Sequence, residues 1–327
     1  MAATDTGFPP APPLKAWQRV VFRLLLGGLA LARRLPDRPI YRVAFVIGAG
    51  LYLVMPGKRD QVRRNLRRVC AWSAQRGDAT PRVARAAADP AALERLVRAS
   101  FGHWVLTYVE AALAPSYGKE ELLARVVLTD QAATDEALSA RPAGEVGPIQ
   151  MAMHYGSVDL SALYGVRVGE LPFTGPMEAV EHPLARAYFD HVRGELGATL
   201  VPIGGAAERL VAALQRGEAA GVVADRNVVG RGVPVELFGA PLRLPIGPAI
   251  LAAQTGATIY LQAIERTGPG EWLGHTIAIR AEPGAQRREA TRSIIEQEAR
   301  AFERLIARAP EQWTTLFFAI WKDDGET

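Results

Sequence analysis

The sequence predicts an α/β fold in which a mainly parallel central sheet is flanked by helices and preceded by a helical, membrane-associating segment. From about residue 145, short apolar runs of strand length alternate with helical segments. Strands that lack polar alternation are typical of parallel sheets covered on both faces. Before that point, residues 14–114 read as helices. The expected organisation is a disordered tail at 1–13, a helical region at 14–114, and an α/β domain at 115–327 that folds continuously with it.

The composition is that of a folded protein, with 327 residues of which 49% are hydrophobic and 22% charged. The single cysteine, Cys70, excludes an intrachain disulfide and a cysteine-based zinc cluster, and points to a reducing compartment. The proline-rich tail lacks the basic start and apolar core of a signal peptide, so we expect no export.

Positive charge is concentrated at the front of the chain. Residues 1–76 hold 14 Lys and Arg against 3 Asp and Glu, whereas the remainder holds 24 against 31. A basic front on a mildly acidic body suits a polyanionic surface, either nucleic acid or anionic lipid. The neighbouring apolar segments decide between these two partners.

Two apolar stretches lie in this basic region, at 20–32 and at 43–57. Both are shorter than the ~20 residues that a bilayer crossing needs, so they fit helices lying in the membrane interface. The alternative is that both are buried helices of a soluble core. The basic run at 58–68 follows, with apolar residues at 62, 66 and 69 that predict an amphipathic helix with a cationic face. We therefore expect an anionic membrane surface as partner and no nucleic acid.

The α/β part predicts elements in the following order. Strands are expected at 146–153, 199–202, 219–224, 257–263 and 274–280, and helices at 157–166, 183–196, 206–216, 246–254 and 288–308.

The sharpest candidate site is His154, which stands where the first apolar strand ends. Gly156 permits a tight turn into the next helix, and Asp159 falls in or near the first turn of that helix. From there its carboxylate can reach one imidazole nitrogen and fix the tautomer, leaving the other nitrogen free to take a proton from a hydroxyl. The residues predict a general base with its orienting carboxylate at the carboxyl end of a strand.

This segment resembles the His-x4-Asp motif of glycerolipid and lysophospholipid acyltransferases. A second block, at 225–257, contains Asp-Arg, Gly-Val, Phe-Gly, Pro-x-Gly-Pro-Ala and Thr-Gly-Ala in that order, and Pro-Glu-Gln-Trp follows at 310–313. The chain thereby resembles the branch that holds the lipid A late acyltransferases and the phosphatidylinositol mannoside acyltransferases. The Asp at 159 and the Asp-Arg opening of the second block tilt the comparison toward the mannoside enzymes.

The resemblance implies transfer of a fatty acyl group from coenzyme A or acyl carrier protein to a hydroxyl of a glycolipid or phospholipid. It implies His154 as base, Asp159 as its orienter, and no cofactor or metal besides the acyl donor. The family also uses a glutamate and an arginine between its main blocks, and Glu178 and Arg193 are the best positional matches, with Glu181 close to the first. The implied location is the cytoplasmic face of the plasma (inner) membrane, as a peripheral or monotopic protein.

Two arginines in a glycine-rich turn after a buried strand, Arg226 and Arg231, are suited to hold a phosphate of the lipid or of the donor. Glu236 in the same block joins them as a predicted substrate-binding residue. Alternatively, Asp225 or Glu236 pairs with an arginine and braces the loop.

Other classes fit less well. Dinucleotide-binding and P-loop motifs are absent. A serine-type lipid esterase or hydrolase stays an alternative, with Ser157 as its nucleophile, and so does a non-catalytic protein that only binds anionic membranes.

For the transferase, backbone amides of the turn at 156–157 or a nearby arginine are the expected oxyanion donors.

Overall fold

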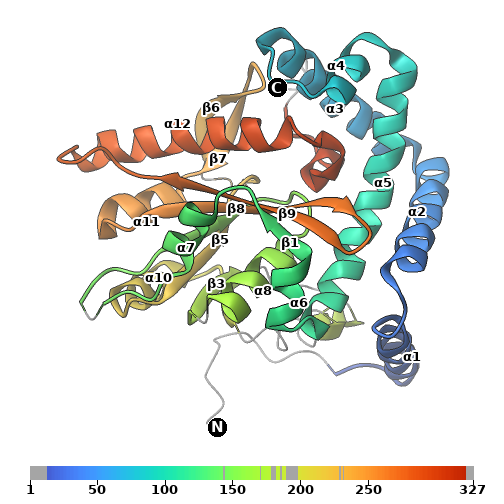
Figure 1. The fold of residues 1–327 in the computed structure, drawn as a ribbon, viewed down its shortest axis with the longest axis horizontal. Coiled ribbons are helices and arrows are strands. Elements are labelled where there is room, and N and C mark those ends of the chain that lie inside the picture. The colour runs from blue at the N-terminus through green and yellow to red at the C-terminus, as the bar shows by residue number, and fades with distance from the viewer. Residues whose placement is uncertain are drawn as a thin grey trace.

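The structure is a computed structural model that describes residues 13–142, 144–169, 171–177, 182–184, 186–188, 198–227, 230 and 232–321 (Figure 1). Its elements are, in order, α1 (Ala16–Ala32), α2 (Asp37–Val54), α3 (Pro56–Arg76), α4 (Pro81–Ala88), α5 (Pro90–Leu113), η1 (Ala114–Ser116), α6 (Lys119–Arg125), β1 (Val126–Leu128), α7 (Gln131–Leu138), β2 (Ile149–Ala152), α8 (Val158–Val168), β3 (Phe173–Met177), β4 (Thr199–Pro202), α10 (Ala206–Gln215), β5 (Ala219–Val223), β6 (Gly232–Leu237), β7 (Ala240–Pro245), α11 (Gly247–Thr255), β8 (Ile259–Gly268), β9 (Glu271–Ile279), α12 (Arg287–Ile306), η2 (Pro310–Gln312) and η3 (Thr314–Phe317).

In the described chain the central sheet has seven strands in the order β1-β9-β8-β2-β5-β3-β4. The five strands from β8 to β4 run parallel to one another. β9 pairs antiparallel with β8, and β1 pairs parallel with β9. The predicted α/β fold with a mainly parallel sheet is therefore confirmed.

The chain changes direction across the sheet between β2 and β5. From β2 it runs through α8 toward β3 and β4, and after β5 it runs through α11 toward β8 on the other side. Figure 1 shows α12 and α8 on opposite sides of the sheet, and α11 packs between α10 and α12. In such sheets the crevice outside the carboxyl ends of the two strands at the switch point is where ligands bind. The fold thus points to the ends of β2 and β5.

The amino-terminal helices begin at well-formed caps. Thr80 accepts a hydrogen bond from the backbone of Val83 at the start of α4, and Asp89 accepts from the first turn of α5. A proline follows each cap, where its missing N–H costs nothing. α3 and α5 share one hydrophobic cluster with the strands β2, β5 and β8 and with α12. Val62, Leu66 and Val69 of α3 are fully buried in it, as the amphipathic pattern predicts.

The helices α1 and α2 instead leave large apolar side chains exposed. These are Trp17, Val20, Val21, Leu24, Leu25 and Leu31 on α1, and Val43, Phe45, Val46, Ile47, Leu53 and Val54 on α2. The two helices stand at one end of the sheet, outside α5 (Figure 1). Among the described residues no single helix has the length and hydropathy to cross a bilayer; α2 and α3 meet the criterion only as a pair, bent by 102°. The alternative considered for residues 43–57, a buried core helix, is wrong for most of this stretch, and their placement in a membrane interface stays a prediction.

Most of the predicted elements match within a few residues, whereas 183–196 lies largely outside the described residues. The main miss is the β6–β7 hairpin, because Pro234, Pro241 and Pro245 argue against a strand. Among the described residues the two strands pair only with each other, so each strand has an outer edge where a proline breaks no strand hydrogen bond. The turn uses Phe238 and Gly239 at positive φ of 49° and 69°, and a Cβ at Gly239 would lie 2.4 Å from the ring of Trp72. This turn explains the Phe-Gly pair of the second block.

One carboxyl in the core predicts a pH dependence of stability. Glu298 of α12 is fully buried, both of its oxygens have no partner among the described residues, and burial raises its pKa to about 8. In the folded protein Glu298 keeps its proton up to about pH 8, whereas in the unfolded chain it loses the proton above its ordinary pKa of 4.5. The free energy of unfolding therefore falls as pH rises from about 4.5 to about 8. We expect Glu298→Gln to remove this fall and to stabilise the protein at pH 8 by on the order of 3 kcal/mol.

Urea unfolding of both proteins across this pH range measures the difference. Glu296→Gln is the control, because this carboxylate is half exposed on the same helix and pairs with Arg292. An identical pH profile for Glu298→Gln and the wild type contradicts the prediction.

Candidate active site

His154 and Asp225 form a hydrogen-bonded pair just beyond the ends of β2 and β5. Nδ1 of His154 lies 2.7 Å from Oδ1 of Asp225. The imidazole is 38% exposed, whereas the carboxylate is 1% exposed. A buried carboxylate that accepts from Nδ1–H fixes the tautomer in which Nε2 carries the basic lone pair. The pair has the geometry of a general base and its orienting group.

Strand register brings the two residues together. β2 and β5 are parallel neighbours with Ala152 opposite Val223, and the amide of Ala224 continues the ladder by donating to the carbonyl of Ala152. His154 and Asp225 each follow their strand by two residues. Parallel strands end at the same edge of a sheet, so the first polar side chains after these strands meet.

The second oxygen of Asp225 is held by two donors from the carboxy-terminal segment. Nε1 of Trp313 and Oγ1 of Thr315 both lie 2.7 Å from Oδ2. Burial alone would raise the pKa of Asp225, but the neighbouring imidazole and these hydrogen bonds lower it to about 2. Asp225 is therefore an anion throughout the neutral range, and Trp313 of the third sequence block orients it.

The backbone of the His154 turn is fixed at several points. The amide of Thr314 donates to the carbonyl of His154 at 2.7 Å, and Tyr155 forms a bridge with Trp313. Gly156 has a φ of 59°, and a Cβ there would lie 1.8 Å from the carbonyl oxygen of Ile264. Only glycine fits this position.

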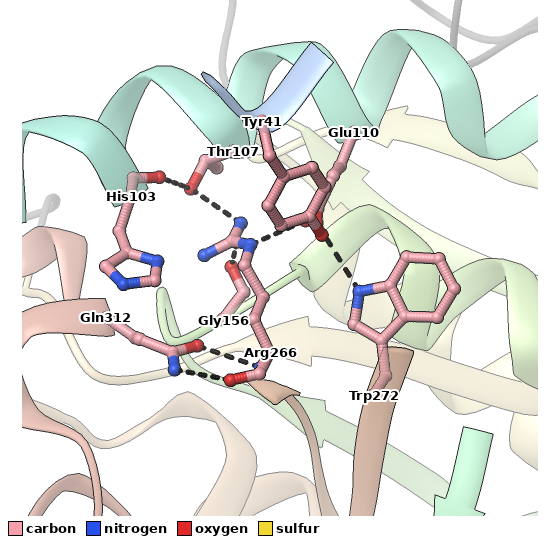
Figure 2. Close-up of polar contacts among 8 residues, drawn as sticks. All are labelled: Tyr41, His103, Thr107, Glu110, Gly156, Arg266, Trp272 and Gln312. Atoms are coloured by element: carbon pink, nitrogen blue, oxygen red, sulfur yellow. Dashed lines mark hydrogen bonds and ion pairs between the residues drawn. The ribbon is translucent and has the colours of Figure 1, made fainter. Parts of the chain in front are cut away.

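A buried ion pair supports the turn from behind (Figure 2). Nε of Arg266 lies 2.8 Å from Glu110, and Nη2 donates to the carbonyl of Gly156 at 2.9 Å. The side-chain amide of Gln312 makes two hydrogen bonds with the backbone of Arg266, each of 2.9 Å. Trp272 and Thr107 complete the cluster around the pair. Strand β8, helix α5 and the segment after α12 thus hold the turn that carries His154.

The amides at 156–157 do not serve as an oxyanion site, contrary to the sequence-based expectation. The amide of Gly156 donates to the carbonyl of Gln312 at 3.1 Å, and that of Ser157 donates to Ile264 at 2.9 Å. Because both N–H groups are used within the backbone, neither is free for a substrate oxygen. Of the expected donors, a nearby arginine remains.

Asp159 lies in the first turn of α8, where the sequence places it, and its charge acts on the Tyr188 hydroxyl, contributing after burial to a raised pKa of about 12. Its pairing with His154 stays a prediction, while Asp225 is the carboxylate that the structure shows at Nδ1. Ser157 is buried at the start of α8, and no hydrogen bond joins its hydroxyl to His154 in the described contacts.

Arg226 follows Asp225 directly and stacks over the ring of Phe318 at 4.4 Å from its centroid. Lys58, from the start of α3, lies 5.2 Å from the same ring and donates to the carbonyl of Phe317. Two cations therefore share one half-exposed ring beside the catalytic carboxylate. Sequence analysis found Arg226 but missed Lys58, because the two are far apart in the chain.

The other predicted binding residues are separated from this pair or undescribed. Glu236 is exposed on β6 and lines a cavity of about 1480 Å³ between the hairpin, α11 and α12, and neither His154 nor Asp225 lines that cavity. Glu178, Glu181, Arg193 and Arg231 lie outside the described residues. In the described part of the chain, no cluster of three or more His, Cys, Asp or Glu side chains is arranged to hold a metal.

Comparison with known proteins gives one family and two named relatives. A family model of the bacterial lipid A biosynthesis acyltransferases matches residues 11–322. The phosphatidylinositol mannoside acyltransferase of Mycolicibacterium smegmatis is 29% identical over 238 residues, which cover 71% of each chain. That of Mycobacterium tuberculosis is 29% identical over 241 residues, or 71% of this chain and 68% of the relative.

Proposed function

Because the chain belongs to the bacterial lipid A biosynthesis acyltransferase family and is an acyltransferase, we propose that it moves a fatty acyl group from a thioester to a hydroxyl of a phosphatidylinositol mannoside-type glycolipid. The buried Asp225 at Nδ1 of the half-exposed His154 is the observation that carries the chemistry. The names of the mycobacterial relatives support the acceptor class. The proposed donor is acyl coenzyme A, with acyl carrier protein as the alternative.

The reaction needs one proton transfer in each direction. Nε2 of His154 takes the proton of the acceptor hydroxyl as its oxygen attacks the thioester carbonyl carbon. The carbon–sulfur bond then breaks, and the imidazolium returns its proton to the thiolate. The products are the acylated lipid and the free thiol, so no covalent enzyme intermediate is required.

We assign the developing oxyanion to a cationic side chain rather than to the turn amides. Arg226 stands next to Asp225 in sequence and projects over Phe318, and Lys58 shares that ring. Either cation suits an anionic donor phosphate as well as a developing oxyanion. Asp159, in the first turn of α8, is proposed to act as a second carboxylate on the imidazole or the acceptor.

The acceptor is proposed to reach the site from the cytoplasmic face of the plasma membrane. The exposed apolar side chains of α1 and α2 suit insertion into the interface, and the arginines around them suit anionic headgroups. On the cationic side of α3, Arg63 pairs with Glu94 and Arg68 stacks on Trp321, so part of that charge is used within the protein.

His154→Ala tests the central assignment. Loss of the base is expected to lower acyl transfer from labelled acyl coenzyme A to a phosphatidylinositol mannoside by about 10²–10⁴-fold. Circular dichroism and vesicle binding are expected to match the wild type, because the imidazole is partly exposed and its removal leaves the core intact. A purified variant with wild-type activity would sink the assignment.

The same assay separates transfer from hydrolysis. Labelled lipid product that forms only when the acceptor is present supports transfer, whereas equal release of free fatty acid with and without it supports an esterase. Ser157→Ala is the matched control, because Ser157 is buried and not bonded to His154. A hydrolase with Ser157 as nucleophile predicts a large loss for this variant; the transferase predicts a small one.

A further inference from the structure

A second polar cavity lies behind the catalytic turn, and neither His154 nor Asp225 lines it. It has a volume of about 690 Å³. Its charged lining residues, together with His103, are Arg38, Arg42, Arg82, Arg266, Glu265 and Glu311. Four arginines against two glutamates give this lining an excess of positive charge.

Most of the inner charges are already paired. Arg82 lies 2.6 Å from Glu311, Arg308 lies 2.8 Å from Glu265, and Arg266 is paired with Glu110. Arg38 and Arg42, by contrast, have neither an ion pair nor a hydrogen bond among the described residues, and both are exposed. The uncompensated positive charge of the cavity is therefore at its mouth.

At the inner end, two buried nitrogen atoms have no partner in the described part of the chain. They are Nη1 of Arg266 and Nδ1 of His103. Figure 2 shows the free end of the guanidinium and the imidazole turned toward each other, with no bond between them. Burial and the charges of Arg266 and Arg82 hold the pKa of His103 well below its ordinary value, so the ring is neutral, and its Nδ1 donates in one tautomer and accepts in the other. In the tautomer protonated at Nδ1, both nitrogen atoms are donors that face one space, and an acceptor oxygen between them satisfies both.

We propose that this cavity binds the phosphate group of an anionic phospholipid, with one oxygen between Arg266 and His103 and with Arg38 and Arg42 at the entrance. The mouth also includes Phe45 of α2, whose ring packs edge-on against His103. Exposed apolar side chains continue along α2 from there, at Val43, Val46 and Ile47. A lipid can thus place its headgroup in the cavity while its chains follow the apolar side of α2.

The site is mechanically connected to catalysis through Arg266. The same guanidinium that offers Nη1 to the cavity donates from Nη2 to the carbonyl of Gly156, in the turn that carries His154. A bound phosphate holds this guanidinium in place and so steadies the turn. We therefore expect the anionic lipid to raise the rate of acyl transfer. This rate effect rests on the proposed function, whereas the binding of the lipid does not depend on it.

Binding is tested by calorimetric titration of the full chain with short-chain phosphatidylglycerol, with short-chain phosphatidylcholine and inorganic phosphate as comparison probes. The wild type is expected to bind phosphatidylglycerol saturably. Arg38→Gln/Arg42→Gln and His103→Phe are each expected to weaken binding by about tenfold or more, through loss of charged and buried donors. Arg287→Gln/Arg288→Gln removes the same charge from exposed positions of α12 and is expected to change binding by less than about twofold.

Several results overturn the proposal. Equal weakening by the two double variants shows general surface attraction, and unaltered binding by His103→Phe shows that the ligand stays outside the cavity. If inorganic phosphate binds as tightly as phosphatidylglycerol, the site takes the free anion and not a lipid. If no probe binds, the cavity holds only water. In the transfer assay, Arg38→Gln/Arg42→Gln is expected to lose stimulation by phosphatidylglycerol, whereas Arg287→Gln/Arg288→Gln is expected to retain it. A failed transfer assay does not affect the binding result, because the titration needs neither donor nor acceptor.

Discussion

Asp225→Asn is expected to lower acyl transfer by about 10³–10⁴-fold, as when the orienting carboxylate of a catalytic histidine becomes an amide. Trp313 and Thr315 both donate to Oδ2, so the amide oxygen of the variant must face them. Its NH₂ group then faces Nδ1, which has to accept a hydrogen bond. The imidazole therefore takes the tautomer protonated at Nε2. In this tautomer Nε2 cannot accept a proton from the acceptor hydroxyl, although the shape of the site is unchanged.

The imidazole ¹⁵N resonances of the variant report this tautomer directly, alongside steady-state transfer rates. Thr315→Val is the graded control, because it removes one hydrogen bond to Oδ2 but leaves the carboxylate charged; we expect a loss of about 3–10-fold, in keeping with about 1 kcal/mol for one hydrogen bond. Since the pKa of Asp225 is about 2, its charge is constant over the neutral range, so titration of Asp225 itself adds no pH dependence to the wild-type rate there. Wild-type activity in Asp225→Asn would show that His154 needs no orienting anion.

Arg266→Met is expected to destabilise the protein by about 3–5 kcal/mol, because it leaves the buried Glu110 without its cation. Both side chains are 2% exposed. Glu110 retains hydrogen bonds from Tyr41 and Trp272, which do not neutralise its charge. Adding Glu110→Gln to the variant removes the unpaired charge and is expected to recover a large part of the loss.

Urea unfolding of the single and double variants measures both effects. The matched control is Arg280→Met, which breaks an ion pair with Glu136 whose two side chains are about half exposed. Such a pair contributes about 0–1 kcal/mol, so the control should be nearly neutral. Similar unfolding free energies for the Arg266 and Arg280 variants would mean that the buried pair does not support the fold.

The sequence was sufficient for most of the elements that it predicted and for one half of the His154–Asp225 pair, but not for β1, β3 or the β6–β7 hairpin. Apolar runs predicted β2, β4, β5 and β8, and His154 stood out because it ends the first of these runs. Asp225 ends another run, yet it was read as a loop residue. The reason is that pairing it with His154 requires knowing that β2 and β5 are neighbours, and strand order depends on contacts between distant segments. A polar residue just after each buried parallel strand was the available signal.

The supporting groups were harder to predict for the same reason. Trp313 belongs to a recognised block, but its role depends on a hydrogen bond to a residue 88 positions earlier. The amides at 156–157 were expected to be free because their backbone partners, Ile264 and Gln312, are even more distant in sequence. Local pattern shows which groups a turn offers; tertiary contacts decide which of them remain available.

Residues 310–315 are synthesised long after the residues that they hold in place. A growing chain contains His154 and Asp225 long before it contains the donors of Trp313 and Thr315 or the strap formed by Gln312 and Thr314. Until those residues emerge, the carboxylate is unanchored and the histidine turn lacks its clamp. The geometry of the pair therefore depends on residues that are made late in synthesis.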